Sequence, residues 1–210
     1  PDINVPEFPT NIYTLNSWFL NVIKDNFSKI SITKEDLKKQ AQYEAKIKRD
    51  NFSKNISYED FLESLDINIQ FFIDDYTNVE RYSQLTQKTN QFNLTTKRYT
   101  ISEIKNFIDS DNYTVIAISY KDKFSNEGIT GLVILNNNEE LIEIDTFLLS
   151  CRILKRGVEK AIFMKLEELY PNKGIIGKYI PTSSNIQTKE LYTTYNFAKI
   201  DDNNFLKNGR

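Results

Sequence analysis

The sequence predicts an α/β (α+β) domain over residues 67–210, in which helices flank one mixed sheet, preceded by a helical segment over residues 1–66. Two observations predict this fold class. From residue 67 onward, β-type runs alternate with helical patterns in the order βααβββαβαβ. Residues 157–170 carry apolar side chains at helical spacing, and a proline at 171 ends the pattern. A hydrophobic content of 40% is enough for such a domain to bury a core.

The first 66 residues differ in character from the rest. Residues 15–23 place apolar side chains at helical spacing, and residues 35–50 are dense in Lys, Glu, Gln and Ala, which favour helix. Thr33 with Asp36 predicts the cap of this long helix, and Ser57 predicts the cap of a short third one. The opening PDINVPEFP reads as the middle of a longer polypeptide, so we expect a lead-in from an upstream domain.

Six strands are expected after residue 66. They cover residues 67–73, 113–120, 128–135, 140–149, 174–180 and 197–200. The first is a run of Ile and Phe, and the second alternates Val115, Ala117 and Ser119 against the residues between them, as a strand does. A turn at residues 125–128 joins the second and third strands as a hairpin. Three asparagines at 136–138 predict a tight turn before the fourth strand.

Four helices are expected among these strands. They cover residues 78–89, 102–109, 157–170 and 187–195. The first places Val79, Tyr82 and Leu85 on one side, and the second begins at a good cap. The third has the clearest apolar face, with Val158 and Ile162 directed inward. No internal repeat or low-complexity linker interrupts the series.

The chain contains no histidine and a single cysteine. These counts exclude Ser-His-Asp triads, Cys-His pairs and His-based zinc sites, so acid-base chemistry falls to Asp, Glu, Tyr, Lys or the lone Cys. We expect no metal site. A net charge of −2 argues against a nucleic-acid partner, and the apolar runs are shorter than the ~18 residues of a membrane span. The single cysteine fits a reducing, cytoplasmic location.

Three segments carry a family resemblance: residues 84–100, residues 144–159, and residues 179–185 followed by 191–197. They resemble the C-terminal half of FkbH-like proteins, in which a HAD-type phosphatase domain precedes a GNAT-like acyltransferase domain. The resemblance runs over roughly residues 57–200, and the predicted element order matches a GNAT core. It implies that residues 67–210 are the GNAT-like domain and that residues 1–66 lead in from the HAD domain. No phosphatase chemistry is expected of this chain.

The resemblance also implies a function. The parent protein would load a glyceryl unit, from a phosphorylated glycerate, onto an acyl carrier protein that serves polyketide-type extender-unit pathways. The cofactor would be acyl-coenzyme A or the phosphopantetheine of the carrier protein, and the partners would be that carrier protein and the upstream HAD domain. Two alternatives stay open. One is a non-catalytic GNAT-fold module that docks the carrier protein, and the other is a small-molecule N-acetyltransferase.

Residues 152–157 are the loop where the resemblance places the phosphate of the thioester. A GNAT domain binds the arm between two parallel strands, with its phosphate on backbone N–H groups at the start of the next helix. Lys155 stands where the first glycine of the loop is usual, which favours a carrier-protein arm over free coenzyme A. The implied cofactor-binding residues are Leu148, Leu149, Arg152, Lys155, Arg156, Gly157 and Asn185. The alternative is a basic helix start without a ligand.

Three residues are candidates for the chemistry. Asp145, on the strand before this loop, is the candidate base, and the alternative is a structural Asp at a strand end. Cys151 is the candidate nucleophile, because cations and a helix N-terminus lower a thiol pKa, and the alternative is a small buried hydrophobe. Tyr192 matches the tyrosine that protonates the departing thiolate in GNAT proteins. Tyr195, the other tyrosine of this segment, is the alternative residue for that position.

Residues 90–98 gather amide and hydroxyl groups in one loop. In a GNAT layout this loop faces the acceptor groove. The resemblance therefore implies substrate recognition by Asn90, Gln91, Asn93, Thr95, Thr96 and Arg98. The alternative is a solvated turn, which is what such a composition usually forms.

Overall fold

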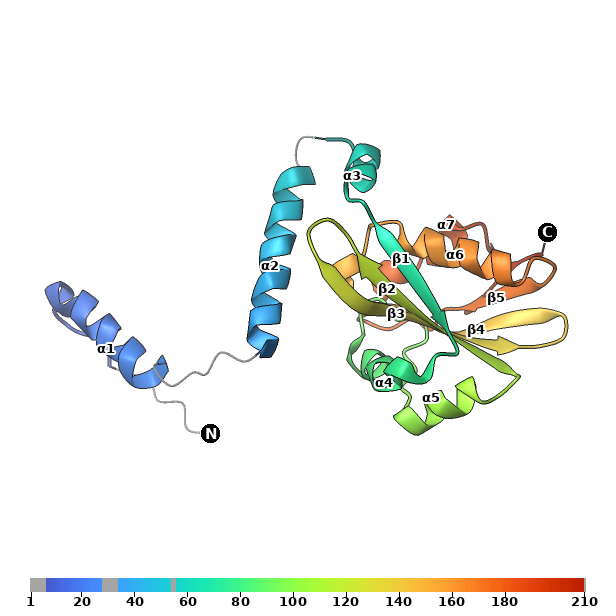
Figure 1. The fold of residues 1–210 in the computed structure, drawn as a ribbon, viewed down its shortest axis with the longest axis horizontal. Helices are drawn as coiled ribbons and strands as arrows, with labels where there is room; N and C mark the ends of the chain where they lie inside the picture. The colour runs from blue at the N-terminus through green and yellow to red at the C-terminus, as the bar shows by residue number, and fades with distance from the viewer. Residues whose placement is uncertain (1–6, 28–33, 54–55, 210) are drawn as a thin grey trace. The chain divides into compact units, whose positions relative to one another are not determined.

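The computed structural model describes residues 7–27, 34–53 and 56–209 (Figure 1). The chain divides into two compact units, residues 1–44 and residues 45–210. The predicted domain boundary between residues 66 and 67 stays a prediction.

The first unit is helical. The short helix η1 (Ile12–Thr14) leads into α1 (Leu15–Phe27), and Phe8 packs edge-on against Trp18 with ring centroids 5.3 Å apart. The helix α2 (Lys34–Ser53) begins in the first unit and ends in the second. Its predicted cap, Thr33, lies outside the described residues.

The second unit is built on a seven-stranded sheet in the order β1-β2-β3-β4-β5-β7-β6 (Figure 1). Its strands are β1 (Asn68–Ile73), β2 (Tyr113–Lys121), β3 (Asn126–Asn137), β4 (Leu141–Leu149), β5 (Gly174–Lys178), β6 (Ala198–Lys199) and β7 (Asn204–Lys207). Neighbouring strands are antiparallel except β4 and β5, which run parallel. The sheet is therefore mixed, as predicted.

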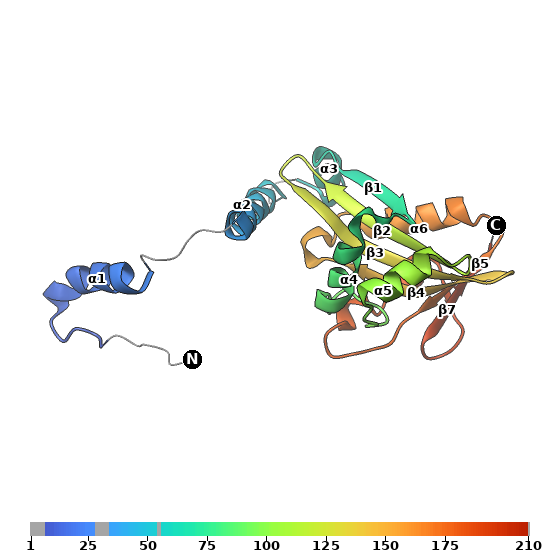
Figure 2. The same cartoon turned by 60° about the horizontal axis from the view of Figure 1, so that its bottom comes forward.

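Helices cover both faces of this sheet. They are α3 (Tyr58–Ser64), η2 (Tyr76–Asn78), α4 (Val79–Lys88), α5 (Ile101–Ile108), η3 (Cys151–Ile153), α6 (Val158–Leu169), η4 (Ile186–Thr188) and α7 (Leu191–Thr194). Figure 2 shows α4 and α5 on one face of the sheet and α6 on the other. Successive strand residues point to opposite faces, so Val115 and Ala117 pack with α4 and α5 while Ile116 and Ile118 pack with α6.

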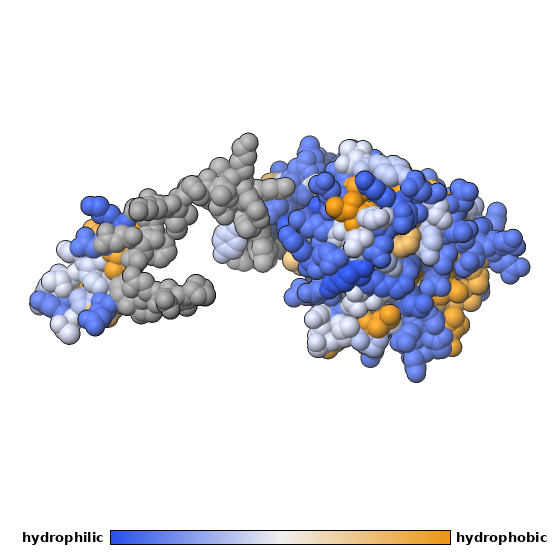
Figure 3. Space-filling view, turned by 90° about the horizontal axis from the view of Figure 1, so that it is seen from below, coloured by the Kyte–Doolittle hydropathy of each residue, from blue (hydrophilic) through white to orange (hydrophobic). Residues whose placement is uncertain are grey.

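Local signals explain where several helices begin. Ser57 Oγ accepts from the backbone N–H of Asp60 and caps α3, as predicted. Thr100 and Glu103 form a capping box, so α5 begins at residue 101. On the α4 and α5 side, the surface of the second unit is mainly hydrophilic with small, separate apolar patches (Figure 3). A large apolar interface is not visible on this face.

Three expected boundaries were wrong. The predicted helix at 187–195 is two short helices, η4 and α7, because the chain turns at Lys189. The predicted turn at 136–138 begins two residues later, at residue 138, because Asn136 and Asn137 still pair with Glu143 and Ile142 in the hairpin. The strand β7 was not predicted, although it is the strand that pairs with β5.

Candidate active site at the split between β4 and β5

The parallel strands β4 and β5 pair only over four residues. The register runs from Leu141 opposite Gly174 to Ile144 opposite Gly177. β4 then continues to Leu149 without β5, still paired with β3 on its other side. A split therefore opens in the sheet after residue 144. The carboxyl ends of parallel strands are where ligands of α/β proteins usually bind.

Tyr192 lies at the base of this split. A Cβ atom on Gly177 would stand 2.2 Å from Tyr192 Cε1, so the ring lies directly against the last paired residue of β5. The phenol donates a hydrogen bond to the carbonyl of Lys178, at 3.4 Å. Burial raises the pKa of Tyr192, so the phenol is protonated at neutral pH and is a weaker acid than an exposed tyrosine. Its role as the acid that protonates a departing thiolate stays a prediction.

Residues 92–95, which we call the strap, fill the split. Leu94 N–H donates to the carbonyl of Phe147 at 3.0 Å, and Leu149 N–H donates to the carbonyl of Phe92 at 3.0 Å. On the other side, Ile180 N–H donates to the carbonyl of Leu94 at 2.8 Å. The strap thus bonds to β4 and to the chain that follows β5, and it is buried throughout.

Several predicted site residues hold the strap in place. Asn185 Nδ2 donates to the carbonyl of Asn93 at 2.9 Å, and Thr95 Oγ1 donates to the carbonyl of Asp145 at 2.9 Å. Asn93 Oδ1 accepts from the backbone N–H of Thr96 at 2.9 Å. These side chains were predicted to bind cofactor or substrate, and in this conformation they bind the protein itself.

Asp145 is nearly buried and has donors on both oxygens. Lys97 Nζ pairs with Oδ1, and Tyr99 Oη donates to Oδ2 at 2.6 Å. Thr146 Oγ1 donates to the same Oδ2 at 3.0 Å. Burial, and then the contact with Asp145, raises the pKa of Tyr99. Lys97 and Tyr99 were missed in the sequence, although both lie in or beside the loop already singled out.

The other loop residues divide between exposed and bonded positions. Arg98 donates to the carbonyl of Thr86 and to the Asn90 side chain, and Gln91 is exposed. The loop therefore consists of a buried centre, the strap, between exposed ends. The expectation of a solvated turn is wrong for residues 92–95.

Residues 155–157 form the backbone turn before α6. Gly157, at the N-cap, has φ 72°, a conformation in which glycine is favoured, and Lys155 has φ 59°. Tyr58 Oη donates to the carbonyl of Lys155 at 3.1 Å. Lys155 itself is exposed. A turn with two left-handed residues therefore lies where the phosphate was predicted to bind, and its role as a phosphate site stays a prediction.

A cavity of about 340 Å³ lies beside this turn. Its lining residues are Tyr58, Phe92, Leu154, Lys155, Gly157, Glu159, Gln187, Thr188, Glu190, Leu191, Thr194 and Tyr195. Burial raises the pKa of Glu159, and the backbone N–H groups of Glu159 and Lys155 offset part of that rise. A carboxylate thus lies near N–H groups predicted to hold a phosphate. Glu159 was not predicted as a site residue.

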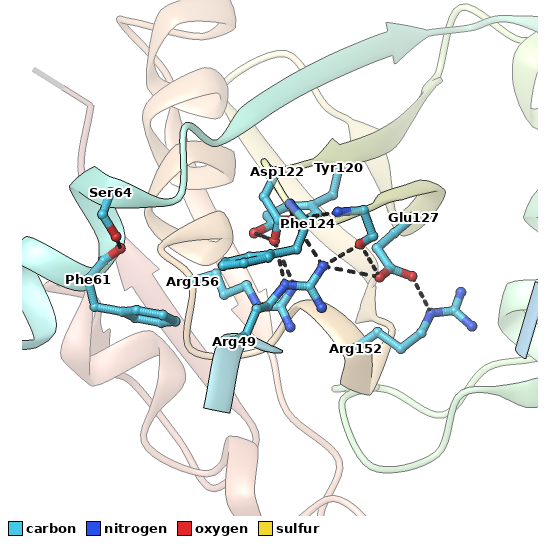
Figure 4. A network of polar contacts seen from close by, with 10 residues as sticks. Arg49, Phe61, Ser64, Tyr120, Asp122, Phe124, Glu127, Arg152 and Arg156 are labelled. Atoms are coloured by element: carbon cyan, nitrogen blue, oxygen red, sulfur yellow. Dashed lines mark hydrogen bonds and ion pairs between the residues drawn. The ribbon is translucent and has the colours of Figure 1, made fainter. Parts of the chain in front are cut away.

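Arg152 and Arg156 belong to a buried charge network (Figure 4). Arg152 Nε pairs with Glu127 at 3.1 Å, and Arg156 Nη1 pairs with Asp122 at 3.5 Å. Arg49, from α2, pairs with both carboxylates. The predicted role of Arg152 and Arg156 as phosphate ligands stays a prediction, and the structure gives each of them a carboxylate partner.

The remaining predicted residues lie along β4 and at its end. Leu148 packs on the α4 side of the sheet and Leu149 on the α6 side. Cys151 begins η3, and its side chain is exposed. The alternative of a buried cysteine is therefore wrong.

The split does not bring the predicted catalytic residues together. The Asp145 carboxylate bonds to Tyr99 on the α4 and α5 side of the sheet, whereas Tyr192 packs against Phe163 of α6 on the other side. Cys151 follows the end of β4, before the turn that leads into α6.

The part of the chain that the structure describes contains neither a metal-binding cluster nor a membrane-spanning helix. Over residues 7–27, 34–53 and 56–209, no cluster of three or more Cys, Asp or Glu side chains is arranged to hold a metal ion. None of the helices in this part of the chain is long and apolar enough to cross a membrane.

Comparison with known proteins identifies the fold. No family model matches the chain, and no curated protein matches its sequence. Among solved structures, the GNAT domain of PAT from S. lividans superposes with a TM-score of 0.51 at 11% identity, covering 67% of this chain and 90% of that one. A domain from Methanocaldococcus jannaschii gives 0.52 at 13% identity, over 68% and 99%. The second unit therefore has the fold of the GNAT acetyltransferases.

Proposed function

We propose that this domain is an acyltransferase that moves an acyl unit to or from a thioester on the phosphopantetheine arm of an acyl carrier protein. The GNAT fold supports acyl transfer in general. The observation that carries the proposal is the split itself, where a buried, protonated Tyr192 lies at the point at which two parallel strands part. A cavity beside the start of α6 adjoins the strap at Phe92.

The resemblance to FkbH-like proteins supports a finer proposal. The acyl unit is a glyceryl group that comes from a phosphorylated glycerate. An upstream HAD domain of the same polypeptide is a partner, and the product enters polyketide-type extender-unit biosynthesis. In this proposal the protein works in the cytoplasm, where the exposed thiol of Cys151 stays reduced.

Glu159 favours a carrier-protein arm over free coenzyme A. Coenzyme A carries a pyrophosphate and a further phosphate, whereas the arm on a carrier protein carries one phosphodiester. Glu159 puts a carboxylate in the cavity beside the turn that would receive the phosphate. Burial raises the pKa of Glu159, and its ionised form repels each additional phosphate charge placed beside the turn. The more highly charged ligand is therefore disfavoured.

Replacing Glu159 by glutamine is expected to weaken the preference for a carrier-protein arm over free coenzyme A. The dissociation constant for coenzyme A should fall at least about tenfold, because the repulsion is removed while the size is kept. That for the 4′-methyl phosphodiester of phosphopantetheine, which carries the single phosphate charge of a carrier-protein arm, should change less. Titration calorimetry of both ligands measures the ratio, and Glu168→Gln on the exposed side of the same helix is the matched control. Native protein that binds coenzyme A as tightly as this phosphodiester contradicts this assignment.

Intact-mass spectrometry tests the transfer itself. We expect the native chain, incubated with a glyceryl- or acetyl-charged carrier protein, to gain the mass of the acyl unit, and Cys151→Ala to lose that adduct. Exposure at the end of β4 makes this thiol accessible. An adduct on both chains would move the attachment elsewhere. Acyl transfer without an adduct would indicate direct transfer, and neither adduct nor transfer would contradict the function.

The buried strap favours a second candidate function, a GNAT-fold module that docks the carrier protein without catalysis. A split that is permanently filled by the protein's own backbone has no place for a thioester arm. The same mass experiment separates the two candidates when carrier-protein binding is measured alongside it. Binding without transfer supports the docking module. Acetyl transfer from acetyl coenzyme A to a small amine, with no use of the carrier protein, supports an N-acetyltransferase.

A further inference from the structure

We propose that the strap, residues 92–95, is a gate that competes with the thioester arm for the edge of β4. The inference rests on the proposed function, because it requires an arm that enters the split. It defines two exclusive states of the domain. In one the strap is bonded to β4, and in the other the arm takes its place.

The strap and an arm exclude each other by space. Leu94 alone spans the split, since its N–H bonds to the carbonyl of Phe147 at 3.0 Å and its carbonyl accepts from Ile180 N–H at 2.8 Å. Its side chain is fully buried. No second chain fits between two walls that one residue bridges with hydrogen bonds.

The strap and an arm also offer the same hydrogen-bonding groups. If the strap leaves, the carbonyls of Phe147 and Asp145 each lose a donor. Three donors lose an acceptor, and they are Leu149 N–H, Ile180 N–H and Asn185 Nδ2. A pantetheine arm has two amides, each with an N–H and a carbonyl, and can satisfy most of these groups. Because unpaired buried groups are unfavourable, the strap stays in place until an arm replaces it.

The ends of the strap allow it to move as a unit. On its N-terminal side, Asn90 and Gln91 are exposed. On its C-terminal side, Thr96 has φ 54°, a left-handed conformation that is unfavourable for a threonine. This strain is present only while the chain is held in the strap conformation, so it favours release once the hydrogen bonds have been replaced.

Residue-resolved amide hydrogen exchange, measured by NMR on the full chain, tests the gate. The probe is S-acetyl-4′-phosphopantetheine. At saturation we expect the amide of Leu94 to exchange at least about tenfold faster, because it loses the carbonyl of Phe147. The amide of Leu149 should stay protected, because the arm replaces the carbonyl of Phe92. A strap that merely loosens would expose both amides.

Thr95→Val is expected to shift the equilibrium from the state with the strap bonded to β4 toward the open state, even without a ligand. It removes the hydroxyl that bonds to the carbonyl of Asp145 and keeps the shape of the side chain. We expect Leu94 to exchange about three- to tenfold faster and the probe to bind about three- to tenfold more tightly. Thr95→Ser keeps the hydroxyl and should behave as native. Thr114→Val, which removes a buried hydroxyl on β2 that bonds to Tyr170, is the control for general destabilisation.

The outcomes separate the gate from the function. If the probe binds and Leu94 stays protected, the gate is wrong and the function stands. If Thr95→Val speeds the exchange of the Leu94 amide but the probe binds neither the native protein nor the variant, the proposed thioester function is wrong. The competition between the strap and the arm then fails with it. If Thr114→Val speeds the exchange of the Leu94 amide as much as Thr95→Val does, the strap behaves as an ordinary part of the core, and the gate is overturned.

Discussion

Replacing Arg49 by alanine is expected to lower the free energy of unfolding of residues 45–210 by about 3–5 kcal/mol. Arg49 is buried, and its Nε and Nη2 donate to the two oxygens of Asp122 at 2.8 and 3.0 Å (Figure 4). Nη2 also lies 3.5 Å from Glu127 Oε1. Without Arg49, each carboxylate keeps one arginine, Arg156 or Arg152, at the edge of the site. The buried oxygens of Asp122 nevertheless lose their two guanidinium hydrogen bonds, and breaking a buried, hydrogen-bonded ion pair is strongly destabilising.

Urea unfolding followed by circular dichroism measures this loss. The control is Lys165→Ala, which breaks a surface pair with the exposed Glu168 and should change stability by less than about 0.5 kcal/mol. A loss below about 1 kcal/mol in Arg49→Ala would show that the network is worth no more than a surface pair. Because Arg152 and Arg156 share its carboxylates, the variant should also disturb the loop before α6.

The pH dependence gives an independent check on the same network. Burial alone would raise the pKa of Asp122, but Arg49 and the N–H groups of Ser125 and Phe124 outweigh it, so the folded pKa lies below the usual 3.8. A lowered carboxyl pKa stabilises the fold above the unfolded value, and this stability is lost as pH falls from about 3.8 through the folded pKa. In Arg49→Ala the folded pKa rises, so less of this acid-sensitive stability should remain.

This network was not predictable from sequence. Arg49 lies in a run of Lys, Glu and Gln that reads as a solvated helix, and its partner Asp122 is 73 positions away. A single charged residue that becomes buried leaves no periodic signal. The strand β7 was missed for a related reason, since its four residues follow a run of Asp and Asn and gain their strand conformation only by pairing with β5.

The candidate site was predictable in position but not in its contacts. The chain order of helices and strands, and with it the place of Asp145 and Tyr192, follows from local patterns and the family resemblance. The strap does not follow, because Asn93 and Thr95 look like loop residues until β4 and Asn185 supply their partners. Buried polar residues are specified by tertiary contacts, and these cannot be read from one sequence.

Replacing Gly177 by alanine is expected to destabilise the domain by about 3 kcal/mol, at the upper end of what overpacking usually costs. The added Cβ would lie 2.2 to 2.5 Å from three atoms of the Tyr192 ring. That ring cannot move aside, because it packs against Phe197 at 5.1 Å and Phe205 at 5.4 Å between ring centroids. Thermal unfolding measures the loss. Gly128→Ala, which has open space but φ +65°, should lose only about 1 kcal/mol.

A double-mutant cycle shows whether Tyr192 is the cause. Leucine at position 192 lacks the ring atoms nearest Gly177, so Gly177→Ala should cost at least about 1 kcal/mol less in a Tyr192→Leu background than in the native chain. Additive losses would mean that β5 itself, rather than the ring, resists a side chain at 177. The expected coupling has a consequence for the site. If only glycine lets the ring lie against the last paired residue of β5, then β5 fixes where the phenol meets the split, and any chemistry by Tyr192 depends on that glycine.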